Sequence, residues 1–147
     1  MGIAIVDAEI GGVGPKHNIH FHEDGPFKGA ALPTGTDALV SDVLDFGEAL
    51  SGVTIRAFAD EAITGTGTGA AVTIKIFAGD NKDATAGSTD WTQVAQISKS
   101  GTAIAAAGDE IGAFTPSPGQ YRKYYYATLE GGAGMAGKVS VYNEVSC

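Results

Sequence analysis

The sequence predicts a single all-β domain, built as a β-sandwich or jelly roll of about eight or nine short antiparallel strands with an N-terminal arm. In Val72–Phe77, apolar side chains alternate with Thr73 and Lys75, as expected for a strand with one buried face. Clusters of Gly, Pro, Asn and Ser separate the apolar runs. No long amphipathic helix is available to cover an open sheet, so two sheets are expected to cover each other.

The expected strands follow one another at short intervals along the whole chain. Val53–Phe58 alternates well, although Phe58 falls on the polar face. Tyr121–Leu129 is rich in aromatic residues, which favour strands. Only Asp45–Leu50 and Asp83–Gly87 could form a helical turn. The complete set of expected strands is Ile3–Ala8, His17–His22, Val40–Phe46, Val53–Phe58, Val72–Phe77, Trp91–Ser98, Ala103–Ala106, Tyr121–Leu129 and Val139–Tyr142.

A change in composition divides the 147 residues near position 38. Residues 39–147 carry the regular strands and are expected to form the sandwich, whereas residues 1–38 are rich in Gly, Pro and His and are expected to be an arm or added hairpin. An arm has unpaired backbone groups that docking along a neighbour's sheet edge would satisfy. Phe21 and Phe27 are the expected anchors in an oligomer or capsid contact, because buried aromatics dominate interfaces. The alternative is that residues 1–38 add a strand to their own sheet.

Charge and cysteine content narrow the expected partners. The net charge is −8, and the nine basic residues are scattered, with only Arg122 and Lys123 adjacent, so neither nucleic acid nor an anionic membrane is expected as a partner.

The single cysteine, Cys147, is the last residue, which rules out an internal disulfide and leaves either an exposed thiol or an intermolecular crosslink. The first residues lack a basic segment and Asp7 interrupts their apolar run, so we expect no signal peptide and synthesis in a cytoplasm.

The strongest candidate for metal chemistry is the run from His17 to His22. His20 and His22 would share one face of a strand, and Gly14, five intervening residues and then His20-x-His22 match the opening of the cupin metal motif. The expected Glu is then missing, and all three His of the chain are already used. We therefore expect no catalytic residue, no bound metal and no cofactor, with His20 and His22 as the remaining metal candidates. A small metal-dependent jelly-roll enzyme is the corresponding alternative function.

Aromatic residues supply a second alternative. Tyr121, Trp91 and the run Tyr124–Tyr126 could stack on sugars or on a protein, which would suit a carbohydrate-binding or adhesin-like β-sandwich. The competing interpretation is that half of these side chains pack the core.

The order of pieces from Val43 onward carries a family resemblance. The pieces are Val43–Gly47, Val53–Phe58, Val72–Phe77 with Ala78–Asp80, Trp91–Ile97, Ala107–Gly112, Pro118–Tyr126 and Gly137–Val139. Together they resemble the jelly-roll capsid decoration (cement) proteins of tailed bacteriophages. The resemblance implies a structural, non-enzymatic protein that forms a homodimer or homotrimer and binds the major capsid protein. Its expected place is the virion, on the outer capsid surface, after synthesis in the bacterial host cytoplasm.

Overall fold

Almost every regular element of the chain is a β-strand, as the alternation of the sequence predicts. The computed structural model describes residues 19–35, 37–45, 53–66, 70–101, 103–120, 122–132 and 134–146. Their strands are β2 (Ile19–Ala31), β3 (Leu39–Val40), β4 (Leu44–Asp45), β5 (Val53–Thr64), β6 (Ala71–Gly79), β7 (Thr92–Ser100), β8 (Ala103–Ala105), β9 (Glu110–Phe114), β10 (Tyr124–Glu130) and β11 (Ala136–Ser146). One short 3-10 helix, η1 (Pro118–Gln120), precedes β10.

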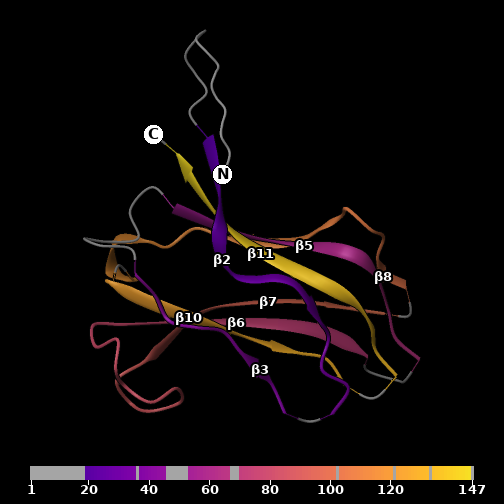
Figure 1. Cartoon of the computed structure of the whole chain (residues 1–147), viewed down its shortest axis with the longest axis horizontal. Coiled ribbons are helices and arrows are strands. Elements are labelled where there is room, and N and C mark those ends of the chain that lie inside the picture. Colours follow the sequence, from indigo (N-terminus) through magenta and orange to yellow (C-terminus); the bar gives the residue numbers. More distant parts are fainter. Residues whose placement is uncertain are drawn as a thin grey trace, which may run out of the picture.

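The strands form two antiparallel sheets that lie one over the other (Figure 1). One sheet has the order β2-β11-β5-β8, and β9 also pairs with β5. The other has the order β3-β10-β6-β7, and β4 also pairs with β10. The prediction of an all-β sandwich is confirmed.

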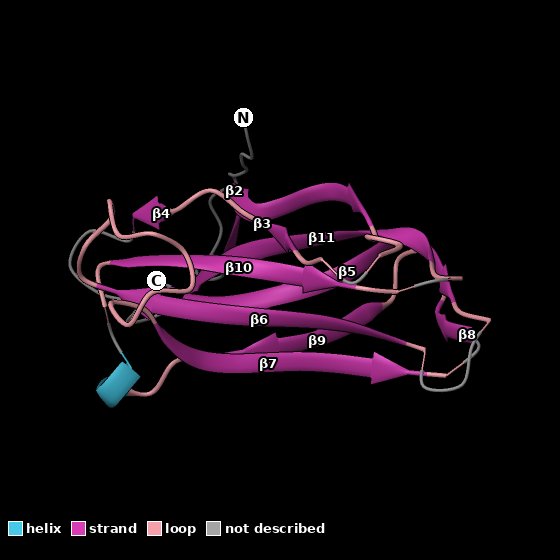
Figure 2. Ribbon diagram, turned by 90° about the horizontal axis from the view of Figure 1, so that it is seen from below, coloured by secondary structure: helices cyan, strands magenta, loops and turns pink. Residues whose placement is uncertain are grey.

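The strand pairs are nested along the chain. Strands β3 and β4 can be counted as one interrupted strand, and β8 and β9 as another. On that count the first described strand, β2, pairs with the last, β11. Moving inward along the sequence, β3 and β4 pair with β10, β5 pairs with β8 and β9, and β6 pairs with β7. The chain is therefore arranged like one long antiparallel hairpin folded over on itself, and Figure 2 shows its strands running lengthwise, seen from below.

The core fills the space between the two sheets. In β6 the residues alternate between buried and half-buried, and Ile74 and Ile76 have no exposed surface. The facing sheet contributes the inward residues of β5 and β11, such as Ile55 and Val141. These apolar faces account for most of the stabilisation of the two layers, because each fully buried aliphatic side chain contributes about 1.5–3 kcal/mol.

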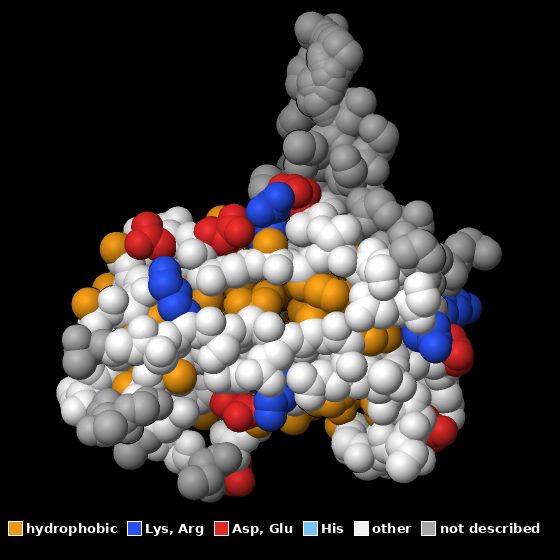
Figure 3. All heavy atoms as spheres, turned by 180° about the vertical axis from the view of Figure 1, so that it is seen from behind, with side chains coloured by type: hydrophobic (Ala, Val, Ile, Leu, Met, Phe, Trp, Pro, Cys, Tyr) orange, Lys and Arg blue, Asp and Glu red, His pale blue; other side chains and the backbone are white. Residues whose placement is uncertain are grey.

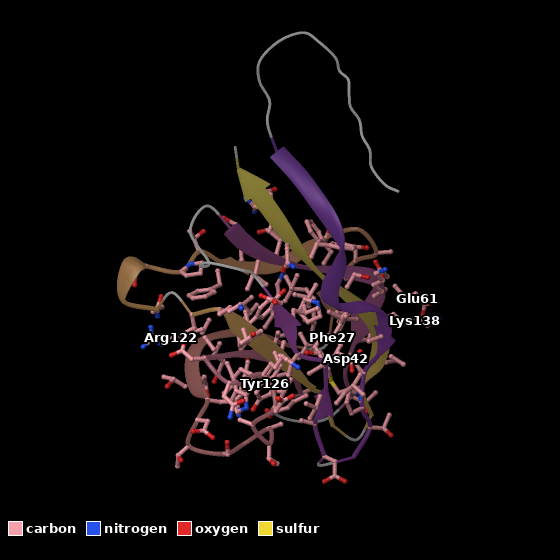
Figure 4. The ribbon with its side chains drawn as sticks, turned by 60° about the vertical axis from the view of Figure 1, so that its left-hand side comes forward. Phe27, Asp42, Glu61, Arg122, Tyr126 and Lys138 are labelled. Atoms are coloured by element: carbon pink, nitrogen blue, oxygen red, sulfur yellow. The ribbon has the colours of Figure 1, made fainter. Side chains whose placement is uncertain are left out.

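The N-terminal region differs from the expected arm. Residues 19–31 form β2, which pairs with β11 and so completes the chain's own sheet. Phe27 is only 5% exposed and lies in the core together with Leu32, as Figure 4 shows for Phe27 between the sheets. The expectation that Phe27 anchors an oligomer or capsid contact is therefore wrong, because its own core already encloses it. Residues 1–18, with the strand expected at Ile3–Ala8, and the side chain of Phe21 lie outside the described part.

Other strands differ in length. The expected strand Val40–Phe46 is split into β3 and β4. Between them the Ser41 N–H still donates to the Ala127 carbonyl oxygen at 2.9 Å, but the Ala127 N–H donates to Ser41 Oγ at 2.9 Å in place of a backbone carbonyl oxygen. The aromatic strand begins at Tyr124 rather than Tyr121. Strand β9 lies where the sequence suggested a connection. Asp83–Gly87 forms turns rather than a helical turn, and most of Asp45–Leu50 lies outside the described residues.

Candidate functional site

A shallow depression lies on the outer face of the sheet that contains β11 and β5. Its volume is about 370 Å³, and it is lined by Phe58, Ala59, Asp60, Gly108 and Tyr142. Neighbouring strands supply Phe58 and Tyr142, and a turn before β9 supplies Gly108. The site therefore combines residues that are far apart in sequence.

Two aromatic rings form one side of the depression. Alternation along β5 turns Ile55 and Ala57 inward, so Phe58 points outward, and alternation along β11 does the same for Tyr142. Phe58 pairs with Ser140 across the two strands, which places Tyr142 diagonally across from Phe58. The ring centroids are 6.1 Å apart and tilted by 48°. The sequence placed Phe58 on the polar face of its strand, and in the structure Phe58 lies on the outer face of β5, beside the depression.

The opposite side is a turn held tightly against β5. The Gly108 N–H donates to the Ala59 carbonyl oxygen at 2.7 Å, and the Ala59 N–H donates to the Asp109 carbonyl oxygen at 2.9 Å. The Asp109 carboxylate accepts the Ala106 N–H at 3.1 Å. Gly108 has φ +90°, a conformation that side chains with a Cβ rarely adopt. The turn is therefore fixed to β5 by two hydrogen bonds and braced internally by a third, and it leaves the depression unfilled at Gly108.

Asp60 lies on the rim and is held by a chain of hydrogen bonds. The Gly29 N–H of β2 donates to Ser140 Oγ at 2.8 Å, and Ser140 Oγ in turn donates to Asp60 Oδ2. Ser140 is only 1% exposed, so its hydroxyl must find its partners within the protein. Three adjacent strands thus fix the orientation of one exposed carboxylate.

The basic residues of β5 and β11, Arg56 and Lys138, are already paired with acids. Arg56 lies 3.1 Å from a Glu110 oxygen and 3.0 Å from a Glu144 oxygen. The hydrogen bond and charge of Glu144, together with Glu110, raise the pKa of Arg56 against the opposing effect of its desolvation. Lys138 pairs with Glu61 at 3.3 Å, and the two lie side by side in Figure 4. Among the described residues, Asp60 has no such cationic partner.

Most of the side chains expected to form a Tyr/Trp surface are buried. Trp91 is 6% exposed and Tyr126 is 2% exposed. Their rings meet edge to face at 4.9 Å, and Phe77 stacks on Tyr126 at 4.9 Å. The loop before Trp91 covers this outer cluster: Trp91 Nε1–H donates to Ala84 O at 3.2 Å, and the Gly87 N–H donates to the Tyr126 hydroxyl at 2.9 Å.

The other tyrosines of that group differ in how far they are buried. Tyr125 has no exposed surface and points into the core, where its hydroxyl hydrogen-bonds to Asn143. Tyr124 is half-buried, with Lys123 Nζ 5.3 Å from its ring centroid. Tyr121 lies outside the described residues. A sugar platform made from Trp91, Tyr125 and Tyr126 is therefore ruled out by their burial.

A second feature is an apolar strand edge. Leu39, Val40 and Val43 are 41%, 49% and 37% exposed, and they are the large exposed hydrophobic residues of the described chain. They lie on β3 and just before β4, at the edge of their sheet, which Figure 2 shows at the margin beyond β10. Natural edge strands usually carry charged residues, often Lys, that prevent pairing with other chains. This edge carries no Lys, and the exposed apolar side chains of Leu39, Val40 and Val43 lie on it beside the exposed Asp42 and Asp45.

The opposite side of the sandwich also shows apolar side chains. Figure 3 displays them as a band between the two layers, on the side away from β2 and β3. There β7 and β9 come together: Gln120 Nε2 donates to Val94 O at 3.1 Å, and Gly112 packs closely on Ile97. Ile97 and Ile111 are 7% and 9% exposed. This band is therefore the edge of the core rather than a separate site.

The metal candidates remain untested by side-chain geometry. His22 and His20 pair with Asn143 and Val145 through the backbone of β2 and β11, while their side chains lie outside the described residues, as do His17 and Cys147. Within the described ranges, no group of three or more His, Cys, Asp or Glu is placed to hold a metal ion. The same part of the chain has no helix with the length and apolar character needed to cross a membrane.

Comparison with known proteins identifies no family. No protein-family model matches the sequence, and neither does any curated protein.

Proposed function

We propose that the protein is a structural, non-enzymatic capsid decoration protein of a tailed bacteriophage. In this proposal it forms a homodimer or homotrimer and binds the major capsid protein on the outer surface of the virion. The observation that carries the proposal is the apolar edge at Leu39, Val40 and Val43. A protein whose task is to hold other proteins together needs such an exposed surface.

The edge suits association through both its backbone and its side chains. On its outer side, β3 has no strand partner among the described residues, so its backbone groups are available to pair with an added strand. Val40 and Leu39 then add apolar contact area to that pairing. The edge strand β7 of the same sheet is different, because Gln93, Gln96 and Lys99 are exposed along it. The two edges of one sheet are therefore not equivalent as interaction surfaces.

The nested pairing of the strands supports the jelly-roll part of the proposal. In a jelly roll, eight strands form two sheets by the folding of one long antiparallel hairpin, and the pairing of β2 with β11 through β6 with β7 has this order. The pieces that resemble decoration proteins begin at Val43 and extend into β11, so the resemblance spans most of both sheets.

Co-sedimentation with capsid shells tests the function. Shells assembled from the major capsid protein of the phage proposed to carry this chain are mixed with the full-length protein and pelleted, and the bound copies are counted. We expect saturable binding by the wild type and binding at least tenfold weaker for Val40→Asp, because the substitution places a charge on the apolar edge. Gln96→Asp on β7 is the matched control and should bind like the wild type.

Two results would contradict the proposal. Wild-type protein that stays in the supernatant at every concentration would exclude capsid decoration. Specific binding to an oligosaccharide array would instead support the carbohydrate-binding alternative. Light scattering of the protein alone tests the oligomeric state, for which a dimer or trimer is expected.

A further inference from the structure

We propose that the depression between Phe58, Tyr142 and Asp60 is a binding site for a cationic side chain, the guanidinium of Arg or the ammonium of Lys, presented by a partner protein. That the partner is the capsid shell rests on the proposed function.

The two rings and the carboxylate recognise different parts of one ligand. The faces of aromatic rings attract cations, and the rings of Phe58 and Tyr142 border the depression. The methylene groups of Arg or Lys can pack against the same rings while the charged head reaches a carboxylate. Asp60 on the rim provides that carboxylate. An apolar wall and an acidic rim together match a long side chain that ends in a positive charge.

Asp60 is oriented before any ligand arrives. Its Oδ2 accepts the Ser140 hydroxyl, which is itself fixed by the Gly29 N–H at 2.8 Å. Within the described residues no hydrogen bond reaches the second oxygen, Oδ1, which can therefore accept from a ligand. An exposed Asp would ordinarily lose side-chain freedom when it binds, and here Ser140 has already removed much of that freedom. Such support of a surface carboxylate by a buried serine is the arrangement expected of a binding group.

The surrounding charge also favours a cation. Strands β2, β5 and β11 and the segment 106–114 carry seven acidic and three basic residues. Two of the basic residues are engaged: Arg56 contacts Glu110 and Glu144, and Lys138 contacts Glu61. An anionic ligand would meet an excess of negative charge, whereas a cation is attracted to it.

The form of the depression indicates a side chain from a protein surface rather than a small free amine. The site is open on the outer face of a sheet, so a small cation would make few contacts there. A side chain that belongs to a docked protein gains the contacts of the whole interface as well. The two rings are tilted by 48° and do not offer one flat platform, which makes them less suited to a sugar ring.

A peptide titration followed by NMR tests the site. The probes are acetyl-Gly-Arg-Gly-amide and the same peptide with citrulline, which has nearly the same shape as Arg but no charge. We expect the Arg peptide to shift the backbone amides of Phe58, Asp60, Gly108 and Tyr142 and to bind at least tenfold more tightly than the citrulline peptide. Asp60→Asn keeps an acceptor for Ser140 and should lower the affinity for the Arg peptide at least tenfold. Asp83→Asn, at an exposed loop aspartate, is the matched control.

A second variant guards against a change of fold. Phe58→Leu keeps an apolar side chain but removes one ring, and it should also weaken binding of the Arg peptide. Equal affinities for the two peptides, or shifts located elsewhere on the protein, would overturn the proposal. Shifts of the same amides by N-acetylglucosamine, with none by the Arg peptide, would overturn it in favour of a sugar site.

The shell assay separates this inference from the proposed function. If wild-type protein binds shells and Asp60→Asn does not, the shell supplies the cationic side chain. If both bind equally, the shell is excluded as its source although capsid decoration stands. If wild-type protein does not bind shells, the proposed function fails, and the peptide titration alone decides the site.

Discussion

The buried hydrogen bond between Tyr125 and Asn143 offers a sharp test of the packing between the sheets. Tyr125 has no exposed surface and Asn143 is 7% exposed, so water cannot replace a lost partner. Tyr125→Phe removes only the hydroxyl and leaves the Asn143 amide oxygen unpaired in the core. The expected loss in the free energy of unfolding is about 1–3 kcal/mol at neutral pH.

The same substitution should change how stability depends on pH. Burial raises the pKa of Tyr125 well above its ordinary value. In the unfolded chain the phenol releases its proton near pH ~10, while the folded protein keeps it. The contribution of Tyr125 is therefore fully present below pH ~10 and declines as the pH rises above that value, by about 1.4 kcal/mol at pH 11. Phe cannot titrate, so the Tyr125→Phe variant lacks this decline, and its deficit should narrow by about that amount between pH 8 and pH 11.

Urea unfolding followed by far-UV circular dichroism measures both effects. Wild type and variant are compared at pH 8 and pH 11, and equal m-values confirm that only stability has changed. Tyr124→Phe, at a half-buried tyrosine whose hydroxyl makes no hydrogen bond within the described residues, controls for loss of a hydroxyl and should change stability at pH 8 by less than about 0.5 kcal/mol. A Tyr125→Phe deficit that stays the same at both pH values would refute the assigned burial of the phenol.

Ile74→Ala removes three buried carbon atoms and should lower the free energy of unfolding by about 2–5 kcal/mol. Thr73→Ala, on the outer face of the same strand, loses only a hydroxyl contact to Ser98 at 3.2 Å and should lower it by about 0.5–1.5 kcal/mol. Equal losses for the two variants would contradict the register of β6. A chain that begins at Leu39 lacks β2 and Phe27 and leaves the edge of β11 unpaired, so it should unfold or aggregate in circular dichroism and light scattering, and a stable folded monomer would show that β2 is dispensable. Dialysis against a chelator should leave the melting temperature unchanged; a fall that Zn²⁺ reverses would indicate a structural metal on His20 and His22.

Strands with strict alternation could be located from the sequence, and those with glycine or proline could not. The alternating residues of Val72–Phe77 lie within β6 with the predicted faces. Strand β9 was missed because Gly108 and Gly112 resemble turn residues. Gly112 is instead required by packing, since a Cβ at this position would lie 2.6 Å from Ile97 Cγ2. Such a requirement comes from the facing strand and leaves no local pattern.

Within residues 1–38, the described residues 19–31 follow the alternative of a strand added to their own sheet, for a related reason. Gly25 and Pro26 suggested a turn, but both belong to β2, which shifts its register along β11 and lies at the edge of its sheet among the described strands. Proline is tolerated on an edge because no neighbour needs its missing N–H. Phe27 therefore enters the core directly after two residues that usually interrupt strands.

The candidate site was only partly visible in the sequence. The outward position of Phe58 was apparent, because it broke the polar pattern of its strand. The role of Asp60 was not, since its contact with Ser140 joins residues separated by 80 positions. Local periodicity cannot provide a register between distant strands that also contain bulges.

The outer cluster under the loop before β7 determines what fluorescence can report. Trp91 is the single tryptophan of the chain, and it packs against Tyr126 outside the main core. Its emission therefore senses the detachment of that loop, whereas circular dichroism senses the melting of the sheets. If the two signals give different unfolding midpoints, the loop opens as a separate unit before the sandwich does. Coincident midpoints would mean that the cluster and the two sheets unfold as one cooperative unit.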